Sequence, residues 1–359
     1  MEKMLNIAMQ RLVSQHFERT DFSTPVELVQ WMGCMQAQDH AAVKWAIGNR
    51  VNGLTDAQVE EDFNAGKVLR THVLRPTWHF VSPADIGWML KLTAPRVKAM
   101  NKPQWRKLGI DEAIIKKSQE LLIKALNGGY HLNRTELAEV FKNNKIDTDE
   151  MRMSYLLIEA ELDGVICSGK REGKQFTYAL FDERVPPVTS FDRETALAEL
   201  TKRYFLSRGP ATITDFCWWS GLNQTDVKRG IEMNKSHFVG EKIGEQVYWF
   251  SPNRKPAVKS KSVYLLSSFD ELAIAYKDRT ALIHHHLINQ TKNGIFSPLI
   301  ITEGQISGTW RRAFVKNEIQ LEIMSLDPLD QYAVQMLHQE ISRYGSFLEM
   351  KLQEPVIGI

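Results

Sequence analysis

A short stretch near the N-terminus places two carboxamides and a carboxylate where an apolar helix should continue. The apolar helical pattern stops at Gly33 and resumes at Ala41. Between them lie Gln36, Gln38 and Asp39, which we call the glutamine corner (residues 36–39). Side chains alternate along an extended backbone, so Gln36 and Gln38 would point to one face if this segment is extended. The three polar side chains would then share one small volume.

The chemistry open to such a pair is the positioning of water or of a ligand. A carboxamide is no base, but its oxygen accepts a hydrogen bond from water while its nitrogen donates one. Asp39 could help to stabilise positive charge, or it could cap the helix expected from Ala41. A purely structural corner, in which both amides satisfy backbone groups, is the other interpretation of the same residues.

No metal site or cofactor is expected from the sequence. Cys34, Cys167 and Cys217 lie far apart without Cys-x-x-Cys spacing, which indicates buried thiols in a reducing compartment. The run from His284 to His286 lacks a neighbouring cysteine and the His-x-x-x-His spacing of a ligand pair. A histidine-bearing loop in contact with DNA is the alternative for that run.

Length, composition and net charge limit the classes of protein to which the chain can belong. A chain of 359 residues is long enough for roughly two to four modules. Hydrophobic residues make up 43% and charged residues 25%, as in folded globular proteins. The net charge of +2 argues against a globally basic coat, so any DNA contact must come from local clusters. Without a signal peptide or an apolar run of bilayer length, we expect a soluble cytoplasmic protein with no membrane contact and no obligate protein partner.

Three helix starts share one capping pattern, a polar N-cap followed three residues later by an acid. They lie at residues 24–27, 133–136 and 212–215. In the middle of the chain, helices are followed by strands at 165–168 and 175–180, joined by the basic, glycine-bounded tip 169–174. Two helices and a hairpin in this order predict a winged helix. Three unrelated capped helical pieces are the alternative.

The same order recurs before and after this unit, and the C-terminal part is rich in strands. The first unit is expected to hold helices over 5–13 and 55–65 and strands over 68–74 and 77–81. The third is expected to hold helices over 194–206, up to Gly221 and over 224–233, and strands over 237–239 and 246–250. In the C-terminal part we expect strands over 263–266, 298–301, 305–310, 319–323 and 347–352, and a helix over 328–344.

The fold class predicted from this order is α+β, with tandem winged-helix units followed by a C-terminal β-rich domain. The expected divisions are a first winged helix with the glutamine corner over 1–82, a helical insert over 83–130, a second winged helix over 131–188, a third over 189–252, and the C-terminal domain over 261–359.

DNA contacts are expected from hairpins and loops rather than from a recognition helix. The helix before the second hairpin carries an excess of carboxylates that phosphates would repel: Asp149, Glu150, Glu159, Glu161 and Asp163. Basic and aromatic residues gather elsewhere and could line a DNA backbone: Arg70, His72, Arg75, Trp78, His79, Lys277, Arg279, Arg311 and Arg312. For Trp78 and His79, core packing and an internal hydrogen bond are equally consistent with the pattern.

Blocks along the whole chain resemble the AlkZ/YcaQ family of winged-helix DNA glycosylases, which are tandem winged-helix DNA-binding proteins. They are QAQD at 36–39, LRTHVLRPTWHFV at 69–81, FDEL at 269–272, YKDR at 276–279, NGIF at 293–296 and GTWRR at 308–312. The resemblance implies three winged helices curved into a C shape around double-stranded DNA, closed by the C-terminal domain.

The resemblance also implies an activity and its residues. That activity is monofunctional hydrolysis of the N-glycosidic bond of bulky N7-alkylated purines, without a metal, and in some relatives the unhooking of interstrand crosslinks. Gln36 and Gln38 match the Gln-x-Gln catalytic motif of the family, whereas crosslink-unhooking relatives can carry Gln-x-Asp. Asp39 stays a secondary candidate, and His40 replaces a proline found at that position in the family. A non-catalytic winged-helix DNA-binding or regulatory protein is the alternative function.

Overall fold

The first sheet of the protein holds the glutamine corner. The computed structural model describes residues 6–18, 21–149, 151–187, 190–253, 255, 262–283, 296–316 and 318–358. Three short strands pair antiparallel in the order β1-β3-β2. The capping box predicted at Thr24 starts the second helix, and Gly33, at φ 75°, ends it. The elements are α1 (Ile7–Ser14), α2 (Pro25–Met32), β1 (Cys34–Gln36), α3 (His40–Gly48), α4 (Asp56–Asn64), β2 (Leu69–His72) and β3 (Trp78–Val81).

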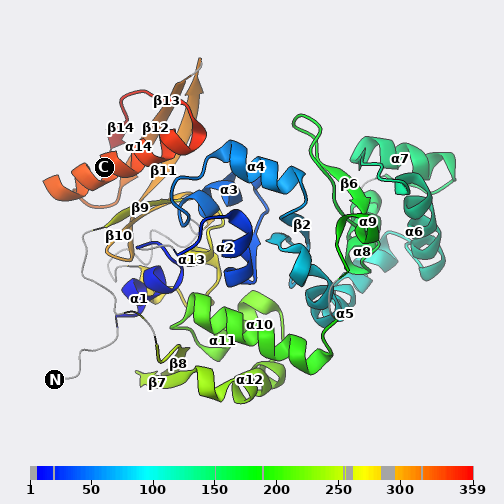
Figure 1. The fold of residues 1–359 in the computed structure, drawn as a ribbon, viewed down its shortest axis with the longest axis horizontal. Helices are drawn as coiled ribbons and strands as arrows, with labels where there is room; N and C mark the ends of the chain where they lie inside the picture. The colour runs from blue at the N-terminus through cyan, green and yellow to red at the C-terminus, as the bar shows by residue number, and fades with distance from the viewer. Residues whose placement is uncertain are drawn as a thin grey trace.

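The middle of the chain forms a helical layer on one side of this sheet, at the right of Figure 1. The capping box at Asn133 and the hairpin with its basic tip are present as predicted. The elements are α5 (Pro83–Lys107), α6 (Glu112–Leu126), β4 (Leu132–Asn133), α7 (Arg134–Asn143), α8 (Arg152–Leu162), β5 (Ile166–Ser168), β6 (Thr177–Leu180) and α9 (Phe181–Arg184).

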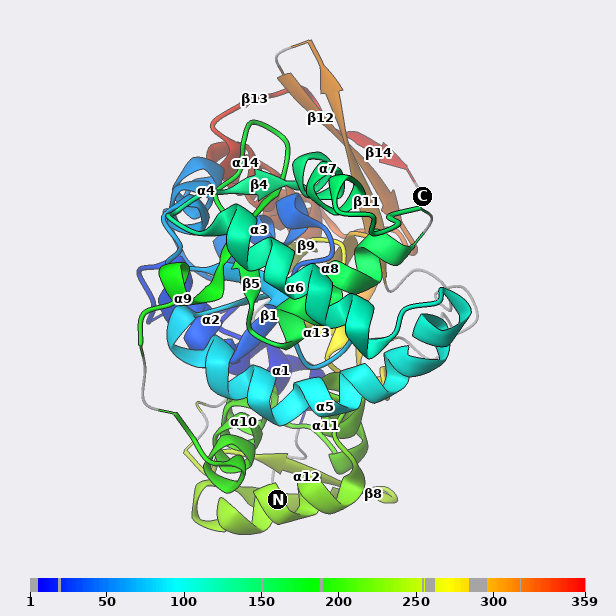
Figure 2. The ribbon, with the colours of Figure 1, turned by 90° about the vertical axis from the view of Figure 1, so that its right-hand side faces the viewer.

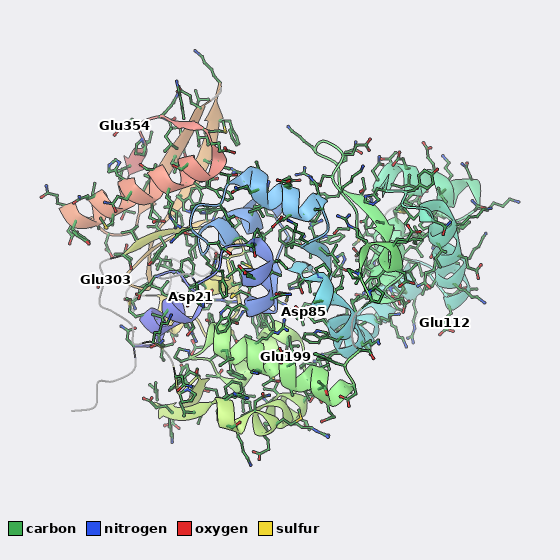
Figure 3. The ribbon with its side chains drawn as sticks, in the orientation of Figure 1. Asp21, Asp85, Glu112, Glu199, Glu303 and Glu354 are labelled. Carbon is green, nitrogen blue, oxygen red and sulfur yellow. The ribbon has the colours of Figure 1, made fainter. Side chains whose placement is uncertain are left out.

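A second helical group lies below the first sheet in Figures 1 and 2. Arg203 joins it to α5, because its guanidinium binds Asp85 of α5 at 2.7 Å and Glu199 of its own helix at 2.8 Å, two residues that lie together in Figure 3. The strand expected over 237–239 is displaced to Val239, because a 3₁₀ turn (Lys235–His237) precedes it. The elements are α10 (Arg193–Arg208), α11 (Ile213–Ser220), α12 (Gln224–Met233), β7 (Val239–Ile243) and β8 (Gln246–Phe250).

The C-terminal part forms a six-stranded sheet covered by one long helix. The expected strand over 347–352 is wrong at its start: the helix continues to Leu348, because Phe347 is buried against Trp45 at 5.1 Å between ring centroids. The elements are β9 (Val263–Leu266), α13 (Glu271–Ile274), β10 (Leu299–Thr302), β11 (Gln305–Val315), β12 (Glu318–Ser325), α14 (Gln331–Leu348), β13 (Lys351–Leu352) and β14 (Val356–Gly358).

The C-terminal sheet packs directly on the N-terminal unit. Trp45 of α3, Trp310 of β11 and Tyr344 of α14 belong to one apolar core. The Trp45 indole N–H donates to the Leu265 carbonyl at 2.7 Å, which fixes α3 against β9. The C-terminal part therefore shares one core with the N-terminal unit that carries the glutamine corner. Within the described residues, no helix is long and apolar enough to cross a membrane.

Candidate active site

The backbone of the glutamine corner is extended up to Gln36 and bends at residues 38–39, so the condition for Gln36 and Gln38 to share one face holds only for the first of them. β1 pairs antiparallel with β3, which places Gln36 opposite His79. The ladder continues for one more bond, because the Ala37 N–H donates to the Trp78 carbonyl at 2.7 Å. The corner then turns into α3, which begins at His40. Two strands and a helix start therefore fix the course of this backbone.

Gln36 is buried and is held at two points. It is 9% exposed, and its backbone N–H donates to Glu271 Oε1 at 2.8 Å. Its side-chain Oε1 accepts from Arg75 Nη2 at 3.3 Å. Because a cation occupies the oxygen, the side-chain amide N–H groups are the part of Gln36 left for other partners.

Gln38 and Asp39 are exposed, in contrast to Gln36. The Gln38 carboxamide oxygen accepts from the Trp78 backbone N–H over a long 3.5 Å. Asp39 caps α3, since its Oδ1 accepts from the Ala42 N–H at 3.0 Å, which confirms the capping interpretation. Its second carboxylate oxygen has no hydrogen-bond partner in the described part of the chain.

A buried ion pair between Arg208 and Glu271 fixes the backbone on both sides of Gly33. Arg208, at the end of α10, binds Glu271 Oε2 through Nε at 2.9 Å and through Nη2 at 2.7 Å. The same guanidinium donates to the carbonyls of Met32 at 2.7 Å and Cys34 at 2.8 Å, on either side of the Gly33 turn. Glu271 therefore joins three segments at the base of the candidate site.

The neighbouring acid repeats this arrangement. Asp270 binds Arg50 of the segment after α3 through two hydrogen bonds, of 2.7 and 2.9 Å, and both side chains are fully buried. Glu271 itself has a further partner: the indole N–H of Trp219 on α11 donates to its Oε2 at 3.0 Å. Arg208, Arg50 and Trp219 were missed by sequence reasoning, although the two acids lie in a motif block that it identified.

Three of the predicted DNA-binding residues are buried and have internal partners. Arg70 Nε donates to the Ala37 carbonyl at 3.0 Å, and burial lowers the pKa of Arg70 to about 10. His72 Nδ1 lies 2.5 Å from Glu161 Oε2. His79 is 0% exposed, its Nδ1 lies 2.8 Å from the Thr77 carbonyl, and burial holds its pKa well below the usual value. Arg70 therefore holds the corner at Ala37, and none of the three side chains is presented to solvent.

The acidic helix also uses part of its charge inside the protein. Glu161 and Glu159 of α8 are buried, and burial raises the pKa of both carboxyl groups. Glu159 pairs with Lys98 of α5 at 2.5 Å, as Glu161 pairs with His72. The sequence interpretation counted both acids on a face open to DNA. Their partners lie on α5 and β2, which pack against α8, and residue spacing along one helix does not reveal such neighbours.

Three other predicted cations gather around one exposed indole. Trp218 of α11 is 38% exposed. The Lys277 ammonium lies 5.3 Å from its ring centroid, the Arg279 guanidinium 5.6 Å and the Arg75 guanidinium 5.9 Å. Because Arg75 also binds Gln36, this cluster adjoins the glutamine corner. Trp218 itself was not predicted. In the sequence it is marked only by its neighbour Trp219, and its exposure becomes visible in the structure.

The family of the chain follows from its match to known proteins. The model of the family described as "DNA glycosylase AlkZ-like" matches residues 29–347, which include the glutamine corner, Glu271 and Trp218. The chain belongs to the AlkZ-like DNA glycosylase family. It is therefore an enzyme that acts on DNA, and we refer to it below as the glycosylase.

The sequence and the fold of the chain are both similar to a glycosylase of Streptomyces sahachiroi. A protein named "Interstrand DNA cross-link repair glycosylase" is 25% identical over 331 residues, which cover 84% of this chain and 85% of that protein. The solved structure of the DNA glycosylase AlkZ superposes with a TM-score of 0.79 at 18% identity and covers 98% of both chains. The glycosylase therefore shares the mixed helix and strand fold of that structure.

Arg311 and Arg312 lie within β11, which is longer than predicted. Arg311 pairs with Glu322 of β12 at 2.8 Å, and both side chains are exposed. Arg312 Nη1 donates to the Tyr344 hydroxyl at 2.6 Å. A small cavity of about 70 Å³ is lined by Arg312 and Asp39 among others, which brings the base of this hairpin close to the corner.

The described residues of the glycosylase form no group of three or more His, Cys, Asp or Glu side chains that could hold a metal. The run from His284 to His286 lies outside the described residues. Cys34 and Cys167 are buried, as predicted, and Cys217 is half-buried. Burial raises the pKa of all three thiols, to about 12 for Cys167.

Proposed function

We propose that the glycosylase hydrolyses the N-glycosidic bond of bulky N7-alkylated purines in double-stranded DNA, with Gln36 and Gln38 as its catalytic pair. We extend this to the unhooking of interstrand crosslinks, because the curated relative carries that activity in its name. The observation that carries the proposal is the unequal pair itself: a buried, doubly held Gln36 beside an exposed, loosely held Gln38.

The reaction suits these residue types. An N7-alkylated purine is cationic and leaves readily, so no strong general acid is needed. A water oxygen forms a bond to C1′ while the C1′–N9 bond breaks, and the electron pair of that bond neutralises the purine. The water loses one proton to solvent or to the free oxygen of Asp39. The protein must position the water and stabilise the positive charge that develops on the sugar.

The two glutamines differ in what they can contribute. The Gln36 oxygen is occupied by Arg75, so its amide N–H groups can donate to the attacking water or to a sugar oxygen. Among the described residues Gln38 makes one long hydrogen bond, so its carboxamide oxygen can turn toward the water or the sugar cation. Asp39 adds a negative charge beside them without leaving its capping position.

We further propose that the helices and hairpins act as tandem winged helices over 1–82, 131–188 and 189–252, with the helical insert 83–130 and the C-terminal domain 261–359. The hairpins β2–β3, β5–β6 and β7–β8 would serve as the wings. The half-buried or exposed side chains among the predicted DNA-binding residues are the proposed contacts: Arg75, Trp78, Lys277, Arg279, Arg311 and Arg312.

The test is a single-turnover assay with purified protein and a duplex that contains one N7-alkylguanine. The proposal predicts an abasic site at the alkylated position and none in the unmodified duplex. A duplex with an N7-linked interstrand crosslink, analysed on a denaturing gel, tests unhooking separately. Binding to the alkylated duplexes without any abasic site, across several bulky lesions, would leave a non-catalytic DNA-binding protein as the function.

A further inference from the structure

Two segments that are distant in sequence bring three positive charges to the ring of Trp218. Arg75 comes from the turn between β2 and β3, and Lys277 and Arg279 come from the segment after α13. All three cationic groups lie between 5.3 and 5.9 Å from the indole centroid. The attraction of a cation to an exposed aromatic ring is weak. One ring therefore gives little compensation for holding three like charges together.

No acid of the described residues forms an ion pair with any of the three cations. Burial lowers the pKa of Arg75 and of Arg279; Glu271 opposes this for Arg75, as Asp215 and Asp278 do for Arg279. The charge of Arg75 also lowers the pKa of Arg279. Among the described residues, Arg75 Nε and Arg279 Nη2 are buried without a hydrogen-bond partner. The cluster therefore has unused donors and no carboxylate in direct contact with its cations.

The nearby carboxylates already have other partners. Asp215 accepts from the backbone N–H groups of Lys277 and Asp278 and lies 3.7 Å from Arg11. Asp278 accepts from the backbone and the hydroxyl of Thr280 through one oxygen. Glu271 is occupied by Arg208. An external anion is therefore the group that the cluster lacks.

The cluster is rigidly placed. The Trp218 indole N–H donates to the Ile274 carbonyl at 3.1 Å, which ties α11 to the segment that carries Lys277. At the end of α11, Gly221 touches the turn before Arg75: a Cβ on this glycine would lie 2.9 Å from the Leu74 carbonyl oxygen. The close approach requires a glycine at this position. The site is therefore organised before any ligand binds.

We propose that Arg75, Lys277 and Arg279, arranged around Trp218, form a binding site for one backbone phosphate of the DNA strand next to Gln36. A phosphodiester supplies the single negative charge and the several acceptor oxygens that the cluster lacks. Arg75 contacts both this site and the Gln36 oxygen, so the bound phosphate sets the position of the strand relative to the glutamine corner. This inference rests on the proposed function.

The first test is the salt dependence of DNA binding by the full-length Lys277→Gln protein. Lys277 is exposed and its side chain has no hydrogen bond in the described structure, so the variant should fold normally. Lys277 supplies one of the three charges around the phosphate, so its loss should reduce the slope of log K against log salt, by at most about 0.9. The matched control is Lys124→Gln on α6, an exposed lysine away from α11 and α13 (Figure 1), which should keep the wild-type slope. An unchanged slope for Lys277→Gln would overturn the inference.

The second test replaces single phosphates of the alkylated duplex by uncharged methylphosphonates, one position at a time. Wild-type protein should bind several-fold more weakly when one particular phosphate beside the lesion is neutral. In Lys277→Gln this same replacement should have a smaller effect, because the contact with that phosphate is already weakened. Equal effects in both proteins at every position would contradict the site. Binding is measured alongside excision, so a protein that binds but does not excise refutes the proposed function and still tests the phosphate site.

Discussion

The two halves of the Gln-x-Gln motif, only two residues apart, lie in opposite environments. Gln36 is buried, paired through its backbone with Glu271 and through its side chain with Arg75. Gln38 is exposed and makes one long hydrogen bond. In the proposed reaction this difference would separate two tasks: the buried half would fix the geometry of the site, and the exposed half would meet water and substrate. Changes on the buried side should cost stability, and changes on the exposed side should cost only chemistry.

The largest effect is expected from Glu271→Ala on the buried side. Removal of this carboxylate leaves the buried Arg208 guanidinium without its counter-charge, which should lower the free energy of unfolding by about 3 to 5 kcal/mol. Urea denaturation measures the loss. The matched control is Glu322→Ala, which breaks the exposed pair with Arg311 and should cost at most about 1 kcal/mol. Equal losses in the two variants would remove the distinction between buried and exposed sides.

The two glutamines themselves give a smaller difference in stability. Gln36→Ala leaves the half-buried Arg75 guanidinium without its acceptor and should cost about 1 to 3 kcal/mol. Gln38→Ala should stay within about 0.5 kcal/mol of the wild type. Thermal and urea unfolding of both variants, measured side by side, gives the two losses of stability. A Gln38→Ala protein as unstable as Gln36→Ala would indicate a structural corner.

The buried side should also respond to acid. Burial lowers the pKa of His79 below its usual 6.5, so the unfolded state binds a proton that the folded state does not. The stability contributed by neutral His79 is therefore present above pH 6.5 and is lost as the pH falls below it, by up to about 1.4 kcal/mol per pH unit. His79→Gln should flatten the fall in unfolding free energy between pH 6.5 and 5.5. An unchanged profile would show that His79 does not titrate on unfolding.

A small change in the folded protein is expected from Arg311→Ala with Arg312→Ala. Both side chains are exposed on β11, but Arg312 also donates to the buried Tyr344 hydroxyl, so their loss should cost about 0.5 to 1.5 kcal/mol of stability. If both contact phosphates, the salt slope of DNA binding should fall by about 1.8. A slope equal to that of the wild type would remove this part of the β11–β12 hairpin from the interface.

Sequence reasoning predicted what is encoded locally. The capping boxes at Thr24, Asn133 and Thr212 and the glycine end of α2 follow from residue types a few positions apart. The Arg208–Glu271 pair did not, because its members are 63 residues apart and nothing in their neighbourhoods indicates the pairing. Arg70 and His72 look like surface charges on a strand, but both faces of β2 are covered. Buried charge pairs depend on which distant segments pack together, and the spacing of residues within one segment does not predict this.

The most direct test of the account compares excision by wild-type and Gln38→Ala protein on a duplex with one N7-alkylguanine, under single-turnover conditions. Loss of one preorganised polar group should lower the rate by about two to three orders of magnitude, with unchanged DNA affinity and melting temperature. Gln38→Glu keeps an acceptor and loses the amide donor, so partial activity there would assign the role to the oxygen. Wild-type excision rates in Gln38→Ala would contradict the account.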